Sequence, residues 1–332
     1  MSVDREIVVA VTGVGAIIGQ GIVRGLRASD RAIRVVGIDR SARSPGPHIV
    51  DAFDQKPEAS EDSEEYQGYW ENLIQRHDIQ IVLPGLDVDM LYMDKNRDWF
   101  ASRGVRLGLN THELIRKTSN KWEFSMALAD IGYPVIPSIR PDTWKEAVDH
   151  LGSPPFLLKP LQANGSRGII KLEDQYDFEY WHTKSTSDWM LQRIVGKYDE
   201  EYTVGVFGLG DGDFIGPLIF RRRLSPAGNT QEAQVVLHHP ILEAAVKRLC
   251  QRFSPIGPTN LQFRVEGDIA YLLEINPRFS SSNSLRTAFG FNEADMAINY
   301  YLFDKTPTQA PLREGCAWRY YEDFIVYASH LI

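Results

Sequence analysis

Short apolar segments alternate with amphipathic segments in the first third of the chain. Residues 6–12, 33–38 and 79–83 are apolar runs of strand length, and the first suits a strand that is covered on both faces. Helical patterns follow the first run as far as Leu26 and appear again over residues 66–76. Strands that alternate with helices predict a parallel, doubly wound α/β sheet.

The pattern changes near residue 112. A helix-like stretch then runs through Ala129, and Gly132 fits its C-terminal stop. From there to about residue 280, strand-like runs are joined by glycine-rich turns, which is α+β patterning rather than repeated βαβ units. We therefore expect two units, residues 1–112 and residues 113–332.

Composition and charge narrow the class of protein. The 332 residues include 43% hydrophobic and 24% charged residues, the balance of an ordinary soluble globular protein. The net charge of −8 argues against a nucleic-acid partner, and the triplet Arg221–Arg223 is too short to reverse that.

Cysteine usage and the N-terminal residues indicate the compartment. Cys250 and Cys316 lie far apart without metal-ligand spacing, as reduced thiols do. The first residues do not resemble a signal peptide, and no apolar run approaches the roughly 20 residues that span a bilayer. We expect a cytoplasmic protein without a membrane partner.

A glycine-bearing turn follows the first apolar run. Gly13, Gly15 and Gly19 lie in this turn, and Asp39 closes the second run. The arrangement imitates a dinucleotide-binding fingerprint, in which loop amides hold a pyrophosphate and the aspartate binds a ribose. The spacing is loose, however, and the glycines can equally serve close packing of a strand on a helix. An NAD-dependent oxidoreductase is thus one alternative function.

A hairpin pattern is the most informative segment of the chain. Two strand patterns flank residues 266–268, which predicts a hairpin with a three-residue loop. In that register Val265 pairs with Ile269 and Leu261 with Leu273, so the odd-numbered apolar side chains share one face. The side chains on the opposite face are Gln262, Glu274 and Asn276.

These three oxygen donors suit Mg²⁺, which prefers hard oxygen ligands. Arg278 lies just beyond the strand, where a guanidinium can bind phosphoryl oxygens. The alternative is a half-exposed hairpin with a polar outer face. Pro277 ends the strand and a polar loop follows at 279–284, which favours a binding site.

The run Glu274-Ile-Asn-Pro-Arg278 resembles the signature of ATP-grasp enzymes, particularly those similar to the carbamoyl-phosphate synthase large chain. Further segments match this family in order between Lys121 and Arg278. They are Lys121 in Ser-Asn-Lys, Lys159 in Phe-Leu-Leu-Lys-Pro, the glycine loop 164–168, and the stretch from Gln192 to Glu201.

The resemblance implies a fold and a set of ligands. It implies a Rossmann-like pre-ATP-grasp domain over residues 1–112 and a two-lobed ATP-grasp domain over 113–332. The first lobe (113–190) would carry a glycine lid at 163–168, and the second (191–332) the metal site. The cofactors implied are ATP and two Mg²⁺ ions, for which Mn²⁺ can substitute.

The resemblance also assigns roles to residues. The lysines would neutralise phosphate charge, and the glycine loop would bring backbone N–H groups to phosphate oxygens. Gln192 and the backbone of Ile194 would face adenine, and Glu201 the ribose. The residues expected at ATP are Lys121, Lys159, Gly165, Ser166, Gln192, Ile194 and Glu201, those at the metal are Gln262, Glu274 and Asn276, and the catalytic ones are Arg278, Lys159 and Arg223.

Two segments are candidates for the second substrate. Residues 221–230 lie where related enzymes place a loop between the nucleotide and that substrate, so Arg223 and Asn229 are expected there unless this is a basic surface strand. The loop Ser280–Ser284, with Ser281 and Arg286, is the candidate acid-binding region because its hydroxyls lie next to a cation.

The leading hypothesis is a ligase that phosphorylates a carboxylate with ATP and transfers the acyl group to an amine. One alternative is a single carbamate- or carboxyphosphate-type phosphorylation step. The others are the NAD-dependent oxidoreductase and a binding protein that retains an ATP site without turnover. The expected partners are small carboxylates and amines. Whether the protein forms a homodimer is left open by the sequence.

Overall fold

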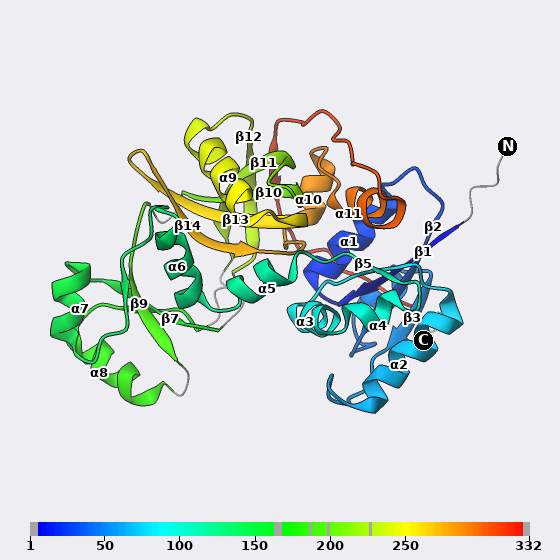
Figure 1. The fold of residues 1–332 in the computed structure, drawn as a ribbon, viewed down its shortest axis with the longest axis horizontal. Helices are drawn as coiled ribbons and strands as arrows, with labels where there is room; N and C mark the ends of the chain where they lie inside the picture. Colours follow the sequence, from blue (N-terminus) through cyan, green and yellow to red (C-terminus); the bar gives the residue numbers. More distant parts are fainter. Residues whose placement is uncertain (1–5, 163–167, 186–187, 198–199, 226–227, 328–332) are drawn as a thin grey trace.

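The computed structural model describes residues 6–162, 168–185, 188–197, 200–225 and 228–327. An N-terminal α/β domain lies at one end, a large antiparallel sheet with its helices lies in the middle, and a small lobe lies at the other end (Figure 1). The expected fold class, a parallel-sheet domain followed by an α+β domain with two lobes, is confirmed.

The N-terminal sheet is parallel, with strand order β3-β2-β1-β4-β5. Alternation along β1 divides its side chains between two cores: Val9 and Val11 pack on the side of α1, and Val8 and Ala10 on the side of α2. Both faces are thereby covered, as the apolar runs predicted. The elements are β1 (Ile7–Thr12), α1 (Ile17–Arg27), β2 (Ile33–Asp39), η1 (Gly46–His48), β3 (Ala52–Gln55), α2 (Glu64–His77), β4 (Ile81–Leu83), α3 (Asp87–Lys95), α4 (Arg97–Ala101) and β5 (Arg106–Leu107).

The central sheet is antiparallel, with strand order β14-β13-β10-β11-β12-β15. Helices α5, α6 and α9 cover one of its faces, where Leu114, Phe124 and Leu249 join the apolar side chains of the strands. The other face carries the polar cluster described below. The elements are α5 (His112–Thr118), α6 (Lys121–Asp130), β10 (Glu201–Leu209), β11 (Phe214–Leu224), β12 (Thr230–Val236), α9 (Pro240–Phe253), β13 (Ile256–Glu266), β14 (Ile269–Asn276) and β15 (Cys316–Trp318).

The small lobe has a core of its own. Its strands run in the order β6-β9-β7-β8, and α7 and α8 cover one face through a cluster that includes Phe156, Phe178 and Leu191. The elements are β6 (Ser138–Ile139), α7 (Trp144–Leu151), β7 (Phe156–Pro160), β8 (Ile170–Leu172), α8 (Gln175–Lys184) and β9 (Trp189–Arg193).

One core joins the N-terminal domain to the central sheet. It contains Val9 and Ile22 from the first domain together with Phe207, Phe220 and Phe291 from the second. Three late elements pack against the first domain here: α10 (Asn283–Ala288), α11 (Glu293–Ala297) and η2 (Ile298–Leu302).

The contact between α1 and α10 is very close. A Cβ atom added at Gly21 of α1 would lie 1.7 Å from Oδ1 of Asn283, so only glycine fits there. Asn283 Nδ2 donates to the Ile18 carbonyl at 3.0 Å, which fixes the approach.

The hairpin of β13 and β14 differs from the predicted register. Glu266 pairs with Ile269 across a two-residue turn, not the expected three-residue loop, and a β-bulge between Gln262 and Phe263 shifts the pairing again. Gln262 then lies opposite Glu274, and Leu261 opposite Ile275 rather than Leu273. The turn and the bulge each displace the register by one residue. Together they restore the face that the sequence had predicted for the polar side chains.

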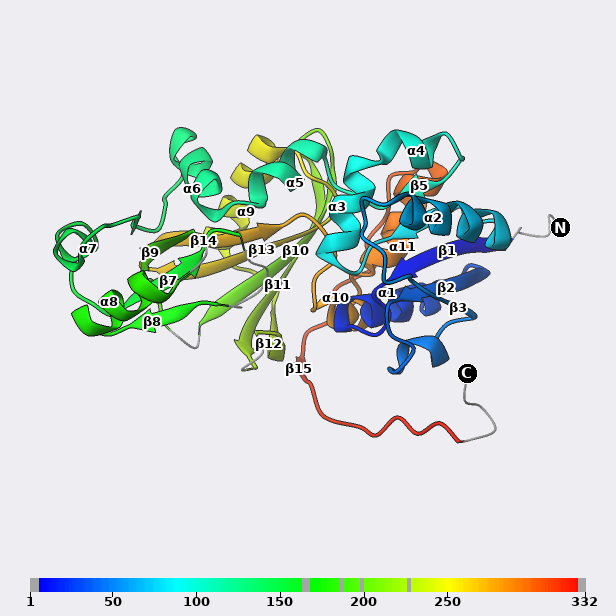
Figure 2. The same cartoon turned by 90° about the horizontal axis from the view of Figure 1, so that it is seen from below.

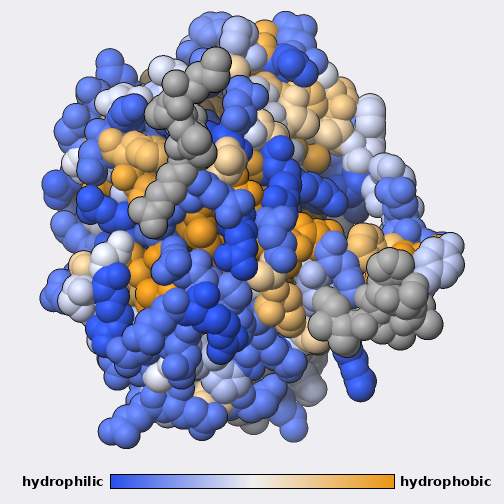
Figure 3. Space-filling view, turned by 90° about the vertical axis from the view of Figure 1, so that its right-hand side faces the viewer, coloured by the Kyte–Doolittle hydropathy of each residue, from blue (hydrophilic) through white to orange (hydrophobic). Residues whose placement is uncertain are grey.

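No helix in the described ranges is both long and apolar enough to cross a membrane. The end of the molecule that the N-terminal domain forms is largely hydrophilic, with patches of apolar residues across its middle (Figure 3).

Candidate active site

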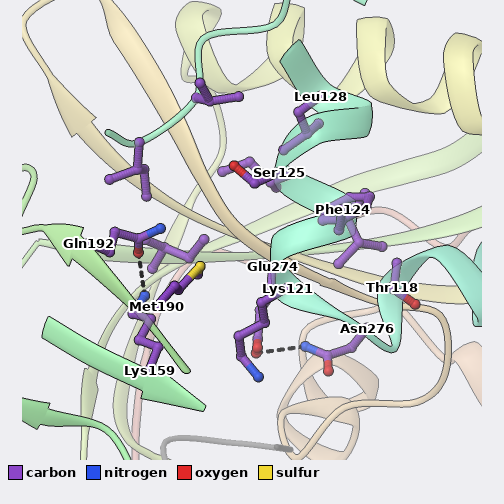
Figure 4. Close-up of a pocket in the computed structure, with 15 residues that line it drawn as sticks. Thr118, Lys121, Phe124, Ser125, Leu128, Lys159, Met190, Gln192, Glu274 and Asn276 are labelled. Carbon is purple, nitrogen blue, oxygen red and sulfur yellow. Dashed lines mark hydrogen bonds between the residues drawn. The ribbon is translucent and has the colours of Figure 1, made fainter. Parts of the chain in front are cut away.

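A pocket lies where the small lobe faces the central sheet. Lys121 enters it from α6, Lys159 from β7, and Glu274 and Asn276 from β14 (Figure 4). One end of the pocket is therefore charged, and the remainder is mostly apolar. The apolar lining consists of Phe124, Leu128, Val135, Ile136, Met190, Leu272, Leu273 and Ile275.

Lys159 is the most deeply placed cation of the pocket, with 8% of its surface exposed. Its Nζ donates to Oε1 of Gln192 at 2.5 Å, and Gln192 in turn donates to the Ser138 hydroxyl at 2.9 Å. Burial lowers the pKa of Lys159 to about 8, with the nearby charge of Lys121 acting in the same direction and that of Glu274 against it. Among the described residues no carboxylate is bonded to this amine, and an anionic ligand would stabilise its charge.

Lys121 is positioned by the start of α6. Asn120 caps the helix through its side chain, which accepts from the N–H groups of Trp122 and Glu123 at 2.9 and 3.2 Å. The Lys121 N–H donates to the Leu161 carbonyl next to the small lobe. Burial lowers the pKa of Lys121, and Glu274 opposes that shift.

Glu274 is the centre of the predicted metal cluster. Its Oε1 accepts from Gln262 Nε2 at 2.6 Å and from Asn276 Nδ2 at 2.9 Å, so the three side chains do lie together. Half a turn of either terminal amide would present its oxygen instead of its nitrogen. The set then offers one carboxylate and two amide oxygens, a donor set that fits Mg²⁺.

Arg222 extends this cluster along the sheet. It is 5% exposed, and its Nη2 donates to Gln262 Oε1 and to Glu201 Oε1, both at 2.7 Å. The second oxygen of Glu201 faces Arg264 at 3.6 Å. Glu201, expected at the ribose, therefore holds two arginines in this structure.

Arg278 is tied to the N-terminal domain. Its guanidinium forms two hydrogen bonds with the carboxylate of Asp87 at the start of α3, one of them between Nη2 and Oδ2 at 3.2 Å. Arg278 thus follows Glu274 and Asn276 in the chain and links the N-terminal domain to the central sheet.

Two residues expected near the second substrate, Arg223 and Asn229, lie away from this cluster. Alternation along β11 puts Arg223 on the face opposite to Arg222, where it is 67% exposed and lies 3.9 Å from Glu232. Asn229 lies beside the turn between β11 and β12, where its carbonyl accepts from the Ser225 N–H at 2.8 Å. The structure brings Arg222, not Arg223, to the cluster.

The polar loop after Arg278 is built differently from the expectation. Arg286 is fully buried and paired with Glu293 at 3.0 Å, so it cannot bind substrate in this state. Ser282 is also fully buried, and its hydroxyl bonds to that of Thr230 at 2.9 Å. Ser281 remains partly exposed.

Of four further residues predicted at ATP, two lie within the described part of the chain. Gln192 lines the pocket, whereas Ile194 follows β9 and is not among the described residues that line it. Gly165 and Ser166, with most of the glycine lid, lie outside the described residues.

Side chains of the same domain contact the N-terminal glycine turn. Gly15 N–H donates to Asp39 Oδ2 at 2.9 Å, and a Cβ on Gly13 would lie 2.6 Å from the Leu86 side chain. In the NAD alternative, Asp39 would bind the ribose and this loop would bind the pyrophosphate. In the structure, Asp39 instead accepts a hydrogen bond from the loop.

Sequence reasoning missed two residues of the site, Arg222 and Asp87. Arg222 could have been predicted from the sequence. Leu218 and Phe220 are apolar and lie on the same face of β11 as Arg222, so strand alternation distinguishes Arg222 from Arg221 and Arg223. For Asp87 no local signal exists, because only the packing of the two domains brings it to Arg278.

Known proteins resemble this chain in both sequence and fold. The sequence family described as "ATP-grasp in the biosynthetic pathway with Ter operon" matches residues 185–324. The carbamoyl phosphate synthase large chain of Streptomyces griseus is 26% identical over 196 residues, which are 53% of this chain and 17% of that protein. The chain therefore spans about a sixth of the length of the curated relatives it matches.

Solved structures resemble nearly the whole chain. The ADP complex of N5-carboxyaminoimidazole ribonucleotide synthetase has a TM-score of 0.69 at 17% identity and covers 92% of this chain and 79% of its own. Biotin carboxylase from Campylobacter jejuni has a TM-score of 0.66 at 17% identity, with 93% and 74% covered. At these identities the likeness shows a shared fold.

Proposed function

Because this chain belongs to the ATP-grasp superfamily, we propose that it is an ATP-dependent carboxylate–amine ligase. In this reaction a carboxylate oxygen attacks the γ-phosphorus of ATP and ADP leaves, which gives an acyl phosphate. An amine nitrogen then attacks the acyl carbon, and phosphate leaves as the amide forms with loss of a proton.

One observation carries the proposal: Lys121, Lys159 and Glu274 meet at one end of a pocket whose other end is apolar. The apolar end suits a purine ring, and the two lysines suit a triphosphate. Gln192 positions Lys159 through its hydrogen bond, and an arriving phosphate would replace a neutral partner of that amine by an anionic one.

Gln262, Glu274 and Asn276 are the residues that would hold Mg²⁺. Bound there, the ion would neutralise phosphate charge and so favour phosphoryl transfer. The protein's own contribution is to hold these three side chains together through the pairing of β13 with β14.

Arg278 would stabilise the phosphoryl group during transfer, and Asp87 would orient its guanidinium. Positioning and charge neutralisation are what phosphoryl transfer requires, because the protein has little covalent chemistry to perform.

A single carboxyphosphate-type step is the second candidate. It is favoured by the resemblance of the chain to the carbamoyl phosphate synthase large chain and to biotin carboxylase. With bicarbonate as the acid, the same pocket would serve the same phosphorylation.

The test is an ADP-release screen with MgATP, paired acids and amines, and bicarbonate as a separate arm. Glu274→Gln should lower ADP formation by about 10²–10³-fold, because the amide keeps the shape and loses the charge. Glu232→Gln is the matched control, since that side chain is 38% exposed on the other face of the sheet.

Equal activity of the Glu274→Gln variant and the wild type would refute the metal assignment. ADP release that needs only bicarbonate would favour the carboxyphosphate step. Binding of NADH without binding of MgATP would overturn the whole proposal.

A further inference from the structure

Arg222 reaches across the central sheet to the proposed metal cluster. It starts from β11, and the strands β13, β10 and β11 lie side by side in that order (Figure 2). Glu201 on β10 lies directly opposite Arg222 on one side and Arg264 of β13 on the other. The Arg222 guanidinium extends past Glu201 to Oε1 of Gln262 on β13, at 2.7 Å. This side chain therefore links the cluster to a strand that carries none of its three members.

The partners of the Gln262 amide determine its orientation. A guanidinium has only donors, so the atom that Arg222 contacts must be the amide oxygen. An ionised carboxylate has only acceptors, so the atom that Glu274 contacts, at 2.6 Å, must be the amide nitrogen. Gln262 thus points its oxygen at Arg222 and its nitrogen at the carboxylate that would hold the cation. In this orientation it presents its nitrogen, not its oxygen, to a metal ion beside Glu274.

Rotation of the Gln262 amide by half a turn would disrupt both contacts. Its oxygen would face the Glu274 carboxylate, and its nitrogen would face the Arg222 guanidinium. A cation bound between Gln262 and Glu274 would remove the first conflict, because both oxygens would then be ligands. The second conflict, donor against donor, would remain until Arg222 moved away. Arg222 is 5% exposed and is also bonded to Glu201 and Thr230, which oppose that movement.

We propose that Arg222 is a positioning residue that keeps the Gln262 oxygen turned away from the metal in the nucleotide-free protein. The inference rests on the proposed function, since it concerns the Mg²⁺ ion of that reaction. The contact of Gln262 with Arg222 and its contact with a cation exclude one another. Without nucleotide the cluster therefore binds a divalent cation weakly. The cation is bound together with the nucleotide, whose phosphates carry oxygen ligands of their own.

The experiment measures Mn²⁺ binding to the full chain without nucleotide, by titration followed with electron paramagnetic resonance. Arg222→Lys keeps the charge beside Glu201, but its compact ammonium group does not span Glu201 and Gln262 as a guanidinium does. Arg221→Lys is the matched control, because Arg221 is an exposed neighbour on the other face of β11, bonded to Gln234. Both lysine substitutions are also made in a Gln262→Met background.

The Arg222→Lys variant should bind Mn²⁺ about tenfold or more tightly than the wild type, because a hydrogen bond to a charged group no longer opposes rotation of the amide. The Arg221→Lys variant should bind Mn²⁺ as the wild type does. The gain should vanish in the Gln262→Met background, where no amide remains to be released. A role of Arg222 in the fold alone would not tighten metal binding.

A measurement on the unsubstituted chain decides the question even if the Arg222→Lys variant does not fold. In ¹⁵N NMR spectra, saturating Mg²⁺ should shift the side-chain amide of Gln262 and the Nε–H of Arg222 together, because one contact replaces the other.

Three results would overturn the proposal: equal Mn²⁺ affinity of the Arg222→Lys variant and the wild type, the same gain in the Gln262→Met background, or a Mg²⁺-induced shift of the Gln262 amide without one of Arg222. Mn²⁺ binding to the wild type in the presence of ADP separates these results from failure of the proposed function. That failure would appear as the absence of Mn²⁺ binding even with ADP.

Discussion

At the scale of single residues, Lys159 is the group whose charge we expect to change when ATP binds. It is almost fully buried, bonded to a neutral amide, and its pKa is lowered to about 8. A triphosphate next to it would raise that pKa again, because opposite charge favours the ammonium form. Binding of ATP is thereby linked to uptake of a proton above pH 8.

The affinity for ATP should therefore fall as the pH rises through about 8. Above that value the free protein has lost the proton that the complex needs, so the apparent affinity weakens by up to about tenfold per pH unit. Titrations between pH 6.5 and 9.5 measure the slope. The Lys159→Gln variant should lose the part centred near pH 8, and Lys145→Gln, an exposed control, should keep it. The same pH profile in the wild type and the Lys159→Gln variant would contradict the linkage.

The arginines show where prediction from sequence succeeds and where it stops. Composition and motif order located the arginine-bearing segments, but they placed Arg223 and Arg286 in the site. In the structure Arg222 lies there, and Arg286 is buried against Glu293. The sequence does not distinguish an arginine that pairs with a buried carboxylate from one that binds a ligand, because only tertiary contacts differ between them.

At the scale of elements, the hairpin of β13 and β14 determines which side chains reach the pocket. The sequence predicted the correct polar face through an incorrect register, because a shorter turn and a bulge cancel each other. Ala270 and Leu272 pack on the helices before the bulge, and Ile275 does so after it. Propensity and alternation do not reveal a bulge, since it conserves composition and changes only the pairing.

Deletion of Leu273 should test the bulge. Without the extra residue, Glu274 would follow Leu272 directly, so regular alternation would keep Glu274 on the polar face, opposite Gln262. We expect the deletion variant to retain MgATP binding and to lose about 0.5–3 kcal/mol in the free energy of unfolding, because the rest of β14 must shift to close the gap. Leu273→Ala keeps the register and should cost about 1–2 kcal/mol, since the side chain is only partly buried. Loss of MgATP binding by a deletion variant that still folds would show that the bulge itself positions Glu274.

At the scale of the whole molecule, the N-terminal domain and the central sheet share a core, while the small lobe has its own. The change of pattern near residue 112 remains a prediction of where one domain ends. The packing nevertheless crosses that position, through Gly21 against Asn283 and Asp87 against Arg278. The two larger parts should therefore lose structure together.

Gly21→Ala should destabilise both larger parts at once, because the added methyl group would overlap Asn283. Gly68→Ala is the matched control: Gly68 lies on α2 with open space around it, and alanine there should stabilise the helix by about 0.5–1 kcal/mol. Hydrogen exchange in the N-terminal and central sheets provides the measurement. Weakened protection in the N-terminal domain alone would mean that the shared core does not couple the two parts.

The contact of α1 with α10 also has a consequence for synthesis on the ribosome. About 250 residues separate Arg27 from Asn283, and at 5–20 residues per second this distance takes roughly 12–50 s to translate. Throughout that interval the side of α1 that will meet α10 and α11 has no partner. The nascent N-terminal domain therefore exposes part of its apolar surface during this interval. Chaperones that bind apolar surface should associate with it until α10 emerges from the ribosome.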